Sequence, residues 1–158
     1  MSGPPEILTE ATGVAVAVDA DGPLAGLILR GASGAGKSTI AAQLIVACPH
    51  RRTRLVGDDV VAVVRGPEGL DLAAPPDAPA GVRGRLEVRG FGPAPAAFAP
   101  RARLRLVADL RADAPRLPER AAFTHDGATA ALLPLRADDP TAAAARIRLI
   151  LRAIIAGQ

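Results

Sequence analysis

The chain has 158 residues, a formal net charge of +3 and 49% hydrophobic residues, but only three aromatic residues. This length and hydrophobic content suit a folded domain with a buried core, whereas alternating charge signs and scarce aromatic rings argue against a nucleic-acid surface. The single cysteine, Cys48, excludes an intramolecular disulfide, and the lack of a signal peptide or an apolar run of ~20 residues favours a cytoplasmic protein without a membrane partner. The chain opens with a polar, proline-containing segment, residues 1–12, for which we expect a flexible lead-in.

Two β-rich segments follow, at Gly13–Val18 and Leu24–Arg30, with a turn signal between them at residues 19–23. Their spacing predicts a hairpin, so we expect a mixed rather than a purely parallel sheet. The second strand runs directly into a glycine-rich loop. A helix is predicted after that loop, over Ser38–Cys48, where Pro49 ends it.

The remainder of the chain alternates short strands with loops. Strands are predicted at Arg54–Gly57, Val60–Val64, Arg85–Arg89, Ala102–Leu110 and Ala130–Leu135. Residues 71–84 and 111–128 are expected to be irregular, and Gly90–Pro95 is expected to form a turn.

The last predicted helix covers Thr141–Ala156, with Asp139 or Thr141 as its N-cap. Its apolar residues recur at helical spacing and predict a core face made of Ile147, Ile150, Leu151, Ile154 and Ile155. Taken together, the elements predict an α/β fold: a P-loop-containing mixed sheet with flanking helices.

The glycine-rich loop carries the most informative motif. The string Gly31-Ala32-Ser33-Gly34-Ala35-Gly36-Lys37-Ser38 matches the P-loop pattern G-x-x-x-x-G-K-[ST]. In such a loop the backbone amides point at phosphate oxygens, the lysine adds positive charge, and the serine hydroxyl can bind Mg²⁺. Lys37 is the only lysine among 19 basic residues, so composition does not account for it. We expect Gly31–Thr39 to bind the phosphates of ATP together with Mg²⁺.

Phosphoryl transfer also needs a carboxylate near the phosphates, either to hold the metal or to accept a proton. The first candidates are Asp58 and Asp59, which directly follow the strand Arg54–Gly57. Because neighbouring side chains on a strand point to opposite faces, one carboxylate could face the phosphate while the other supports it. The alternative is a polar turn that closes the strand, and we favour the functional interpretation.

Two further positions have carboxylates. Asp109 ends the apolar run Leu104–Ala108, and we favour a structural strand end over a metal ligand there. Glu87 and Arg89 stand two apart on a predicted strand and therefore share a face. A carboxylate beside a guanidinium could bind Mg²⁺ and phosphate respectively, but an ion pair at a sheet edge explains the pattern equally well.

In chain order, three elements resemble the catalytic domain of the HPr kinase/phosphorylase family: Gly31–Ser38, Leu55–Asp59 and Leu86–Gly92. The family has a P-loop, a V-A-D-D element and an L-E-I-R-G-L-G element. The resemblance covers about residues 13–155 and is closest to the short alphaproteobacterial form. It implies a single P-loop kinase domain over residues 13–158, preceded only by the lead-in and lacking an N-terminal regulatory domain.

The resemblance implies a serine protein kinase that phosphorylates HPr, the phosphocarrier of the phosphotransferase system, in an assembly of several copies. It implies that Lys37 neutralises ATP phosphates, that Ser38 and Glu87 hold Mg²⁺, and that Arg89 guides the transferred group. The pair Asp58 and Asp59 would deprotonate the target serine, with Asp59 favoured, and the same group would serve the reverse dephosphorylation.

The chain also departs from the family pattern. The family has a histidine upstream of the P-loop, where the nearest equivalents here are Glu10 and Thr12, and Arg136 is the nearest counterpart of a late glycine-arginine-asparagine element. Two alternatives therefore stay open: an ATP-binding regulatory module without phosphoryl transfer, and a P-loop kinase of small metabolites.

Overall fold

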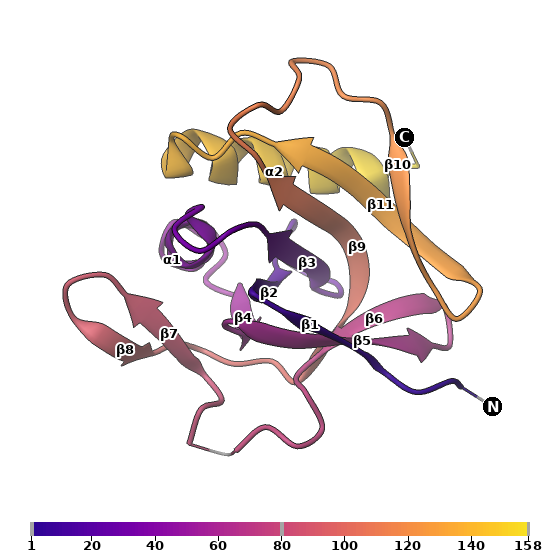
Figure 1. The fold of residues 1–158 in the computed structure, drawn as a ribbon, viewed down its shortest axis with the longest axis horizontal. Coiled ribbons are helices and arrows are strands. Elements are labelled where there is room, and N and C mark those ends of the chain that lie inside the picture. Colours follow the sequence, from indigo (N-terminus) through magenta and orange to yellow (C-terminus); the bar gives the residue numbers. More distant parts are fainter. Residues whose placement is uncertain (1, 80, 158) are drawn as a thin grey trace.

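The computed structural model describes residues 2–79 and 81–157 (Figure 1). In chain order the elements within these residues are β1 (Glu6–Thr9), β2 (Ala11–Val16), β3 (Ala25–Arg30), α1 (Lys37–Val46), β4 (Arg54–Gly57), β5 (Val60–Gly66), β6 (Gly69–Ala73), β7 (Arg85–Val88), β8 (Gly92–Pro95), β9 (Arg101–Leu110), β10 (Ala121–His125), β11 (Ala128–Leu135) and α2 (Pro140–Ile155).

Most strands join one mixed sheet, in the order β1-β5-β6-β9-β3-β2-β4, with β11 paired to both β9 and β10. The predicted hairpin of β2 and β3 is antiparallel, whereas β3 and β11 both run parallel to β9. The mixed sheet inferred from sequence is therefore confirmed. Strands β7 and β8 form a separate two-stranded sheet, which stands beside α1 in Figure 1.

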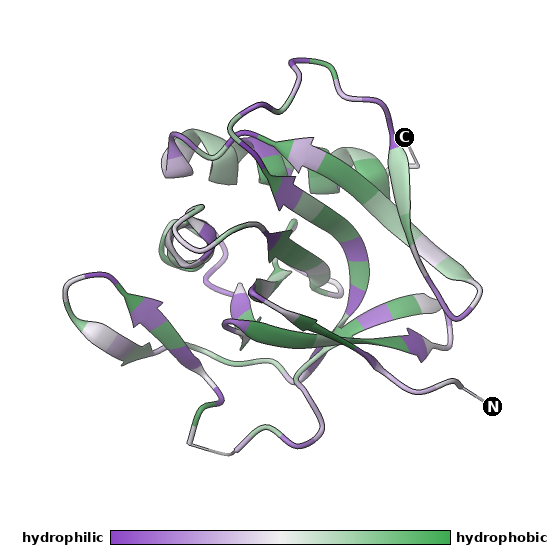
Figure 2. Cartoon of the chain, in the orientation of Figure 1, coloured by the Kyte–Doolittle hydropathy of each residue, from purple (hydrophilic) through white to green (hydrophobic). Residues whose placement is uncertain are grey.

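The main sheet buries apolar side chains on both faces. In Figure 2, β3 is accordingly mostly green, whereas β9 alternates between green and purple bands. On one face α1 and α2 pack over residues such as Leu27, Leu29 and Leu106. On the other face Ile28 and Val107 pack with apolar residues of β5, β6 and β10. This two-sided burial holds β3 and β9 rigidly, and β3 is the strand that leads into the glycine-rich loop.

Helix α2 shows how the sequence specifies a local structure. The Asp139 side chain accepts hydrogen bonds from the amides of Thr141 and Ala142, as an N-cap does, and Pro140 occupies the first turn. Of the predicted apolar face, Ile147 and Leu151 are fully buried, whereas Ile155 is exposed. Arg148 of α2 donates to the carbonyl of Leu44 and so binds the last turn of α1.

Four short strands were not anticipated from sequence. Strand β1 lies within the segment expected to be flexible and pairs with β5, so that expectation is wrong for residues 6–9. Strand β6 begins just before the expected loop 71–84 and extends into it. Strand β8 lies within the expected turn 90–95, and β10 lies within the stretch 111–128 that was expected to be irregular. Each is a short edge or hairpin strand whose pairing depends on partners distant in sequence or on a tight turn. Among the described residues, no helix has the length and apolar character needed to cross a bilayer.

Candidate functional site

The glycine-rich loop connects β3 to α1 in the order that the motif requires. Gly34 and Gly36 both adopt positive φ angles, of 82° and 98°, which side chains rarely tolerate. Gly36 is also the N-cap residue of α1, and no side chain caps the helix there. A Cβ built at Gly34 would meet no atom within 4 Å, so the loop backbone is open to an approaching ligand. Uncapped amides and the positive end of the helix dipole make this a suitable anion site.

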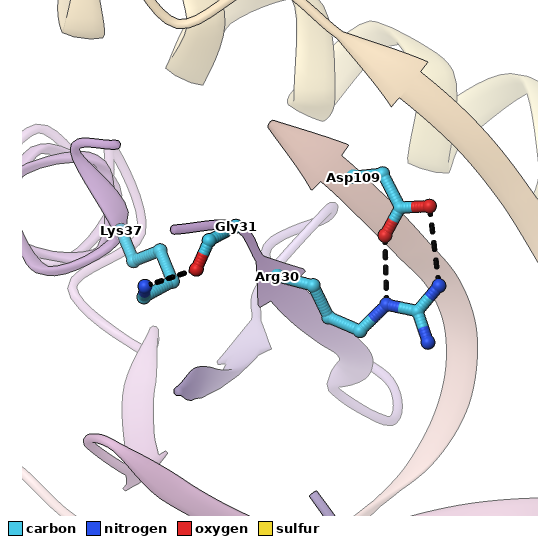
Figure 3. A network of polar contacts seen from close by, with 4 residues as sticks. All are labelled: Arg30, Gly31, Lys37 and Asp109. Carbon is cyan, nitrogen blue, oxygen red and sulfur yellow. Dashed lines mark hydrogen bonds and ion pairs between the residues drawn. The ribbon is translucent and has the colours of Figure 1, made fainter. Parts of the chain in front are cut away.

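Lys37 turns back over the start of its own loop. Its Nζ donates to the Gly31 carbonyl oxygen at 2.5 Å (Figure 3). It also donates to the Ala32 carbonyl oxygen at 3.1 Å. Both acceptors are neutral, so no carboxylate neutralises this ammonium in the recorded contacts of the described residues. The ammonium therefore keeps its charge available at the loop.

A bidentate ion pair joins β3, the strand that leads into the glycine-rich loop, to β9. The Arg30 guanidinium donates through Nε and Nη2 to both oxygens of Asp109, at 2.7 and 3.1 Å (Figure 3). It also lies over the Phe123 ring, 5.7 Å from the ring centre. Because Arg30 directly precedes Gly31, this pair fixes the position where the loop leaves the sheet. The preference for a structural role at Asp109 agrees with this geometry, since the carboxylate faces Arg30 and does not line the cavity described below.

The two adjacent aspartates lie in a bend rather than on a strand. Asp58 and Asp59 connect β4 to β5, and Asp59 has a φ of 72°. Glu10, at the bend between β1 and β2, has a φ of 52°, and the next amide, of Ala11, donates to the Asp59 carbonyl at 3.2 Å. The bend between β1 and β2 and the bend between β4 and β5 therefore lie against each other. Backbone strain of this kind often marks functional sites.

Because of the bend, Asp58 and Asp59 line the same cavity instead of facing opposite sides of a sheet, as the sequence had led us to expect. Asp58 is half-buried and Asp59 is exposed. Gly57 is required just before them, since a Cβ there would lie 2.7 Å from the Val60 carbonyl oxygen.

Asp58 is the hub of the polar contacts in the cavity. Its Oδ1 accepts hydrogen bonds at 2.9 Å from the hydroxyls of Thr12 and Ser38, and its Oδ2 accepts one at 2.9 Å from the Glu87 amide. Thr12 is completely buried, so its hydroxyl is committed to this bond. Ser38, the P-loop serine, is thereby placed directly against a carboxylate.

The separate sheet of β7 and β8 forms the opposite wall. Arg85, Glu87 and Arg89 recur at every second residue, and all three line the cavity. Glu87 and Arg89 thus line the same cavity, as predicted, although β7 ends at Val88 and Arg89 lies in the turn that follows it. Arg85 belongs to the same face and was missed, although the same alternation could have identified it. Leu86, between them, points the other way and is buried in the core.

The cavity between these walls has a volume of about 670 Å³. That size is within the range of small-molecule sites. It brings together every predicted site residue except Gly31 and Ala32, whose carbonyls bind Lys37 instead. Val82 and Pro93 also line it and were not anticipated, because only the fold brings these loop and hairpin residues to the P-loop. Arg136 is not among the lining residues; it donates to the Ala114 carbonyl.

The residues present fit a nucleotide with Mg²⁺. Among residues 2–79 and 81–157, no cluster of three or more His, Cys, Asp and Glu side chains could hold a metal alone. Mg²⁺ is, however, commonly held by one or two carboxylates together with substrate phosphates and water. The Ser38 hydroxyl hydrogen-bonded to Asp58, with Glu87 lining the same cavity, supplies that kind of incomplete ligand set.

The fold and this loop define an α/β protein with a central mixed sheet, flanking helices and a P-loop-like turn. No protein-family model matches the sequence, and no curated protein matches it either. Among solved structures, the Hpr(Ser) kinase/phosphatase from Coxiella burnetii matches with a TM-score of 0.71. The match covers 94% of this chain and 89% of that chain at 18% sequence identity. The chain therefore has the fold of that kinase/phosphatase, in agreement with the fold class expected from sequence.

Proposed function

We propose that the chain is an ATP-dependent serine protein kinase that acts on an HPr-like phosphocarrier protein. The observation that carries the proposal is the convergence of the P-loop, the Asp58–Asp59 bend and the Glu87–Arg89 segment on one cavity. The structural neighbour adds support, because it has the same fold and is named as a kinase/phosphatase of Hpr(Ser).

In this proposal Gly34, Gly36 and the first turn of α1 hold the phosphates through backbone amides, and Lys37 adds a positive charge. Mg·ATP, when bound, supplies the transferable phosphoryl group and the metal charge. The Ser38 hydroxyl, Asp58 and Glu87 would hold the metal. The hydrogen bonds from Thr12 and the Glu87 amide fix the orientation of Asp58.

Asp59 is the proposed general base. Its carboxylate is exposed in the cavity, and none of the recorded hydrogen bonds of the described residues engages it, in contrast to Asp58. It would take the proton from the hydroxyl of the target serine as the serine oxygen bonds to the γ-phosphorus and the bond to ADP breaks. In the reverse direction the same group would return a proton to the leaving serine. Arg89 would guide the phosphoryl group.

The test is one assay with purified protein, Mg·ATP and the HPr of the same organism, read as phosphoserine by mass spectrometry. Lys37→Ala should lower the rate by at least about 100-fold, since a charge at the transferred group is lost. Asp59→Asn should lower it by about 100-fold through loss of the base, while nucleotide affinity stays within about threefold. Arg116→Gln, an exposed change outside the cavity, is the matched control. An inactive wild-type chain that still binds nucleotide would contradict the proposal.

That last outcome would select a second candidate, a nucleotide-binding regulator without transfer. The feature that favours it is the upstream pair Glu10 and Thr12, both of which line the cavity but neither of which is a histidine. A small-metabolite kinase would instead phosphorylate a low-molecular-weight acceptor in the same assay.

A further inference from the structure

A second cavity, distinct from the nucleotide site, lies where the main sheet divides. One edge of β9 pairs with β6 over Arg101–Arg103 and with β11 over Leu106–Leu110. Between these ranges β6 and β11 part, and a cavity of about 310 Å³ opens there. None of its lining residues lines the P-loop cavity.

Arg105 lies at the point of β9 where β6 and β11 separate. On the other edge of β9 the register with β3 jumps from Gly26 opposite Leu104 to Leu27 opposite Leu106. Arg105 is therefore the extra residue of a β-bulge, and no neighbouring strand has a residue opposite it. Gly26 allows this close approach, because a Cβ there would lie 2.7 Å from the Arg103 carbonyl oxygen. Bulges of this kind redirect a side chain, and Arg105 is one of the residues that line the cavity.

The charges in this cavity are unbalanced. Its charged lining residues are two arginines, Arg103 and Arg105, and one glutamate, Glu68. Glu68 pairs with Arg103 at 3.1 Å and is 74% exposed, so that bond is weak and easily exchanged. In the described residues no recorded hydrogen bond or ion pair engages Arg105. Burial lowers the pKa of the Arg105 guanidinium, the charge of Arg103 lowers it further, and Glu68 opposes this in part.

The other lining groups suit a small organic molecule. Thr129 offers an exposed hydroxyl, and the apolar part of the wall comes from Ala121, Ala122, Ala131 and Ile154. The volume exceeds what one phosphate or carboxylate group fills and lies at the low end of small-molecule sites. We propose that this cavity binds a small organic oxyanion, with its phosphate or carboxylate head on Arg103, Arg105 and Thr129 and its carbon chain against the alanines. This proposal does not rest on the proposed kinase function.

The experiment is an NMR titration of the ¹⁵N-labelled chain with inorganic phosphate, and separately with propionate, at constant ionic strength. It is carried out in wild type and in Lys37→Ala, which weakens phosphate binding at the P-loop. We expect saturable shifts at the amides of Gly69, Arg105 and Ala122 in both proteins for at least one probe. The probe with the lower Kd identifies the head group.

Arg105→Gln should weaken this binding at least tenfold, whereas Arg116→Gln should not change it. Ala122→Glu tests the same site without altering the bulge, because it adds a carboxylate to an exposed wall position, and it should also weaken binding at least tenfold. Leu117→Glu, which adds the same charge at an exposed loop position that lines neither cavity, is its matched control. Shifts that grow linearly with both anions, or that persist unchanged in Arg105→Gln or in Ala122→Glu, would overturn the proposal.

Discussion

The bend between β4 and β5 and the end of β9 place aspartates in similar sequence contexts but in different surroundings. Asp58 directly follows β4, and Asp109 is the last residue but one of β9. Asp58 accepts hydrogen bonds from two hydroxyls and an amide, all of them neutral donors, inside the P-loop cavity. Asp109 meets a guanidinium in a bidentate pair and takes no part in that cavity.

The difference shows that the hydrogen-bond partner of a carboxylate, rather than its position at the end of a strand, decides what the carboxylate can do. A carboxylate neutralised by arginine has its charge already balanced and contributes to rigidity. A carboxylate held only by neutral donors keeps its full negative charge for a metal or a proton. Four predictions test this contrast, beginning with the largest effect.

Asp58→Asn should lower phosphoryl transfer by at least about 100-fold, because the negative charge beside Ser38 disappears while the shape is retained. Asp109→Asn, the matched change at the other aspartate, should lower it by less than about tenfold. Initial rates with Mg·ATP and HPr measure both. Equal losses in the two variants would contradict the assignment of different roles.

Asp109→Asn should instead lower the free energy of unfolding by about 1–2 kcal/mol, since a bidentate, half-buried pair with Arg30 is lost. Urea unfolding measures the change, and a double-mutant cycle with Arg30→Gln isolates the pairwise part. A coupling energy near zero would show that the pair of Arg30 and Asp109 does not stabilise the contact between β3 and β9.

Thr12→Val should reduce transfer by about tenfold and the free energy of unfolding by about 1 kcal/mol, because a buried hydroxyl that orients Asp58 is removed. Thr12→Ser retains the hydroxyl and should restore the rate. A rate in Thr12→Val equal to that of wild type would exclude a positioning role for Thr12.

The smallest effect is expected at Asp113, an exposed aspartate paired with Arg111 at 3.1 Å. A hydrogen bond from Arg111 and its positive charge hold the pKa of the Asp113 carboxyl below its ordinary value. Any stability from this pair is present above the carboxyl's unfolded pKa and is lost as pH falls through the lowered value. Arg111→Gln should raise that pKa in a ¹³C NMR titration. Asp113→Asn should leave the urea midpoint at pH 7 unchanged. A clear shift of that midpoint would contradict the expectation that this exposed pair stabilises the fold less than the pair of Arg30 and Asp109.

The local parts of the molecule were predictable from sequence. The β2–β3 hairpin, the P-loop, α1 and the Asp139 cap of α2 depend on turn residues, a motif and helical spacing that lie close together in the chain. Strand β8 was missed because its Gly and Pro residues are typical of turns, and β6 and β10 were missed because each is short and lies beside a proline-containing stretch. Their pairing is decided by neighbours rather than by their own propensities.

The candidate site was likewise predictable from sequence only in part. The P-loop, Asp58, Asp59, Glu87 and Arg89 could be proposed from motifs, but their convergence on one cavity could not. The left-handed bend at Asp59 brings both aspartates to one side, and no local pattern announces it. Val82 has no chemical signature at all and enters the cavity only because the segment before β7 folds over it.

The separate sheet of β7 and β8 has a consequence for engineering. It shares no strand pairing with the main sheet, and Leu86 is its one side chain in the buried core of the described residues. Its backbone touches the opposite wall through the Glu87 amide on Asp58. Residues 84–95 are therefore suited to exchange: graft libraries that retain Leu86, Glu87 and Arg89 could vary acceptor preference while leaving the phosphate-binding wall intact.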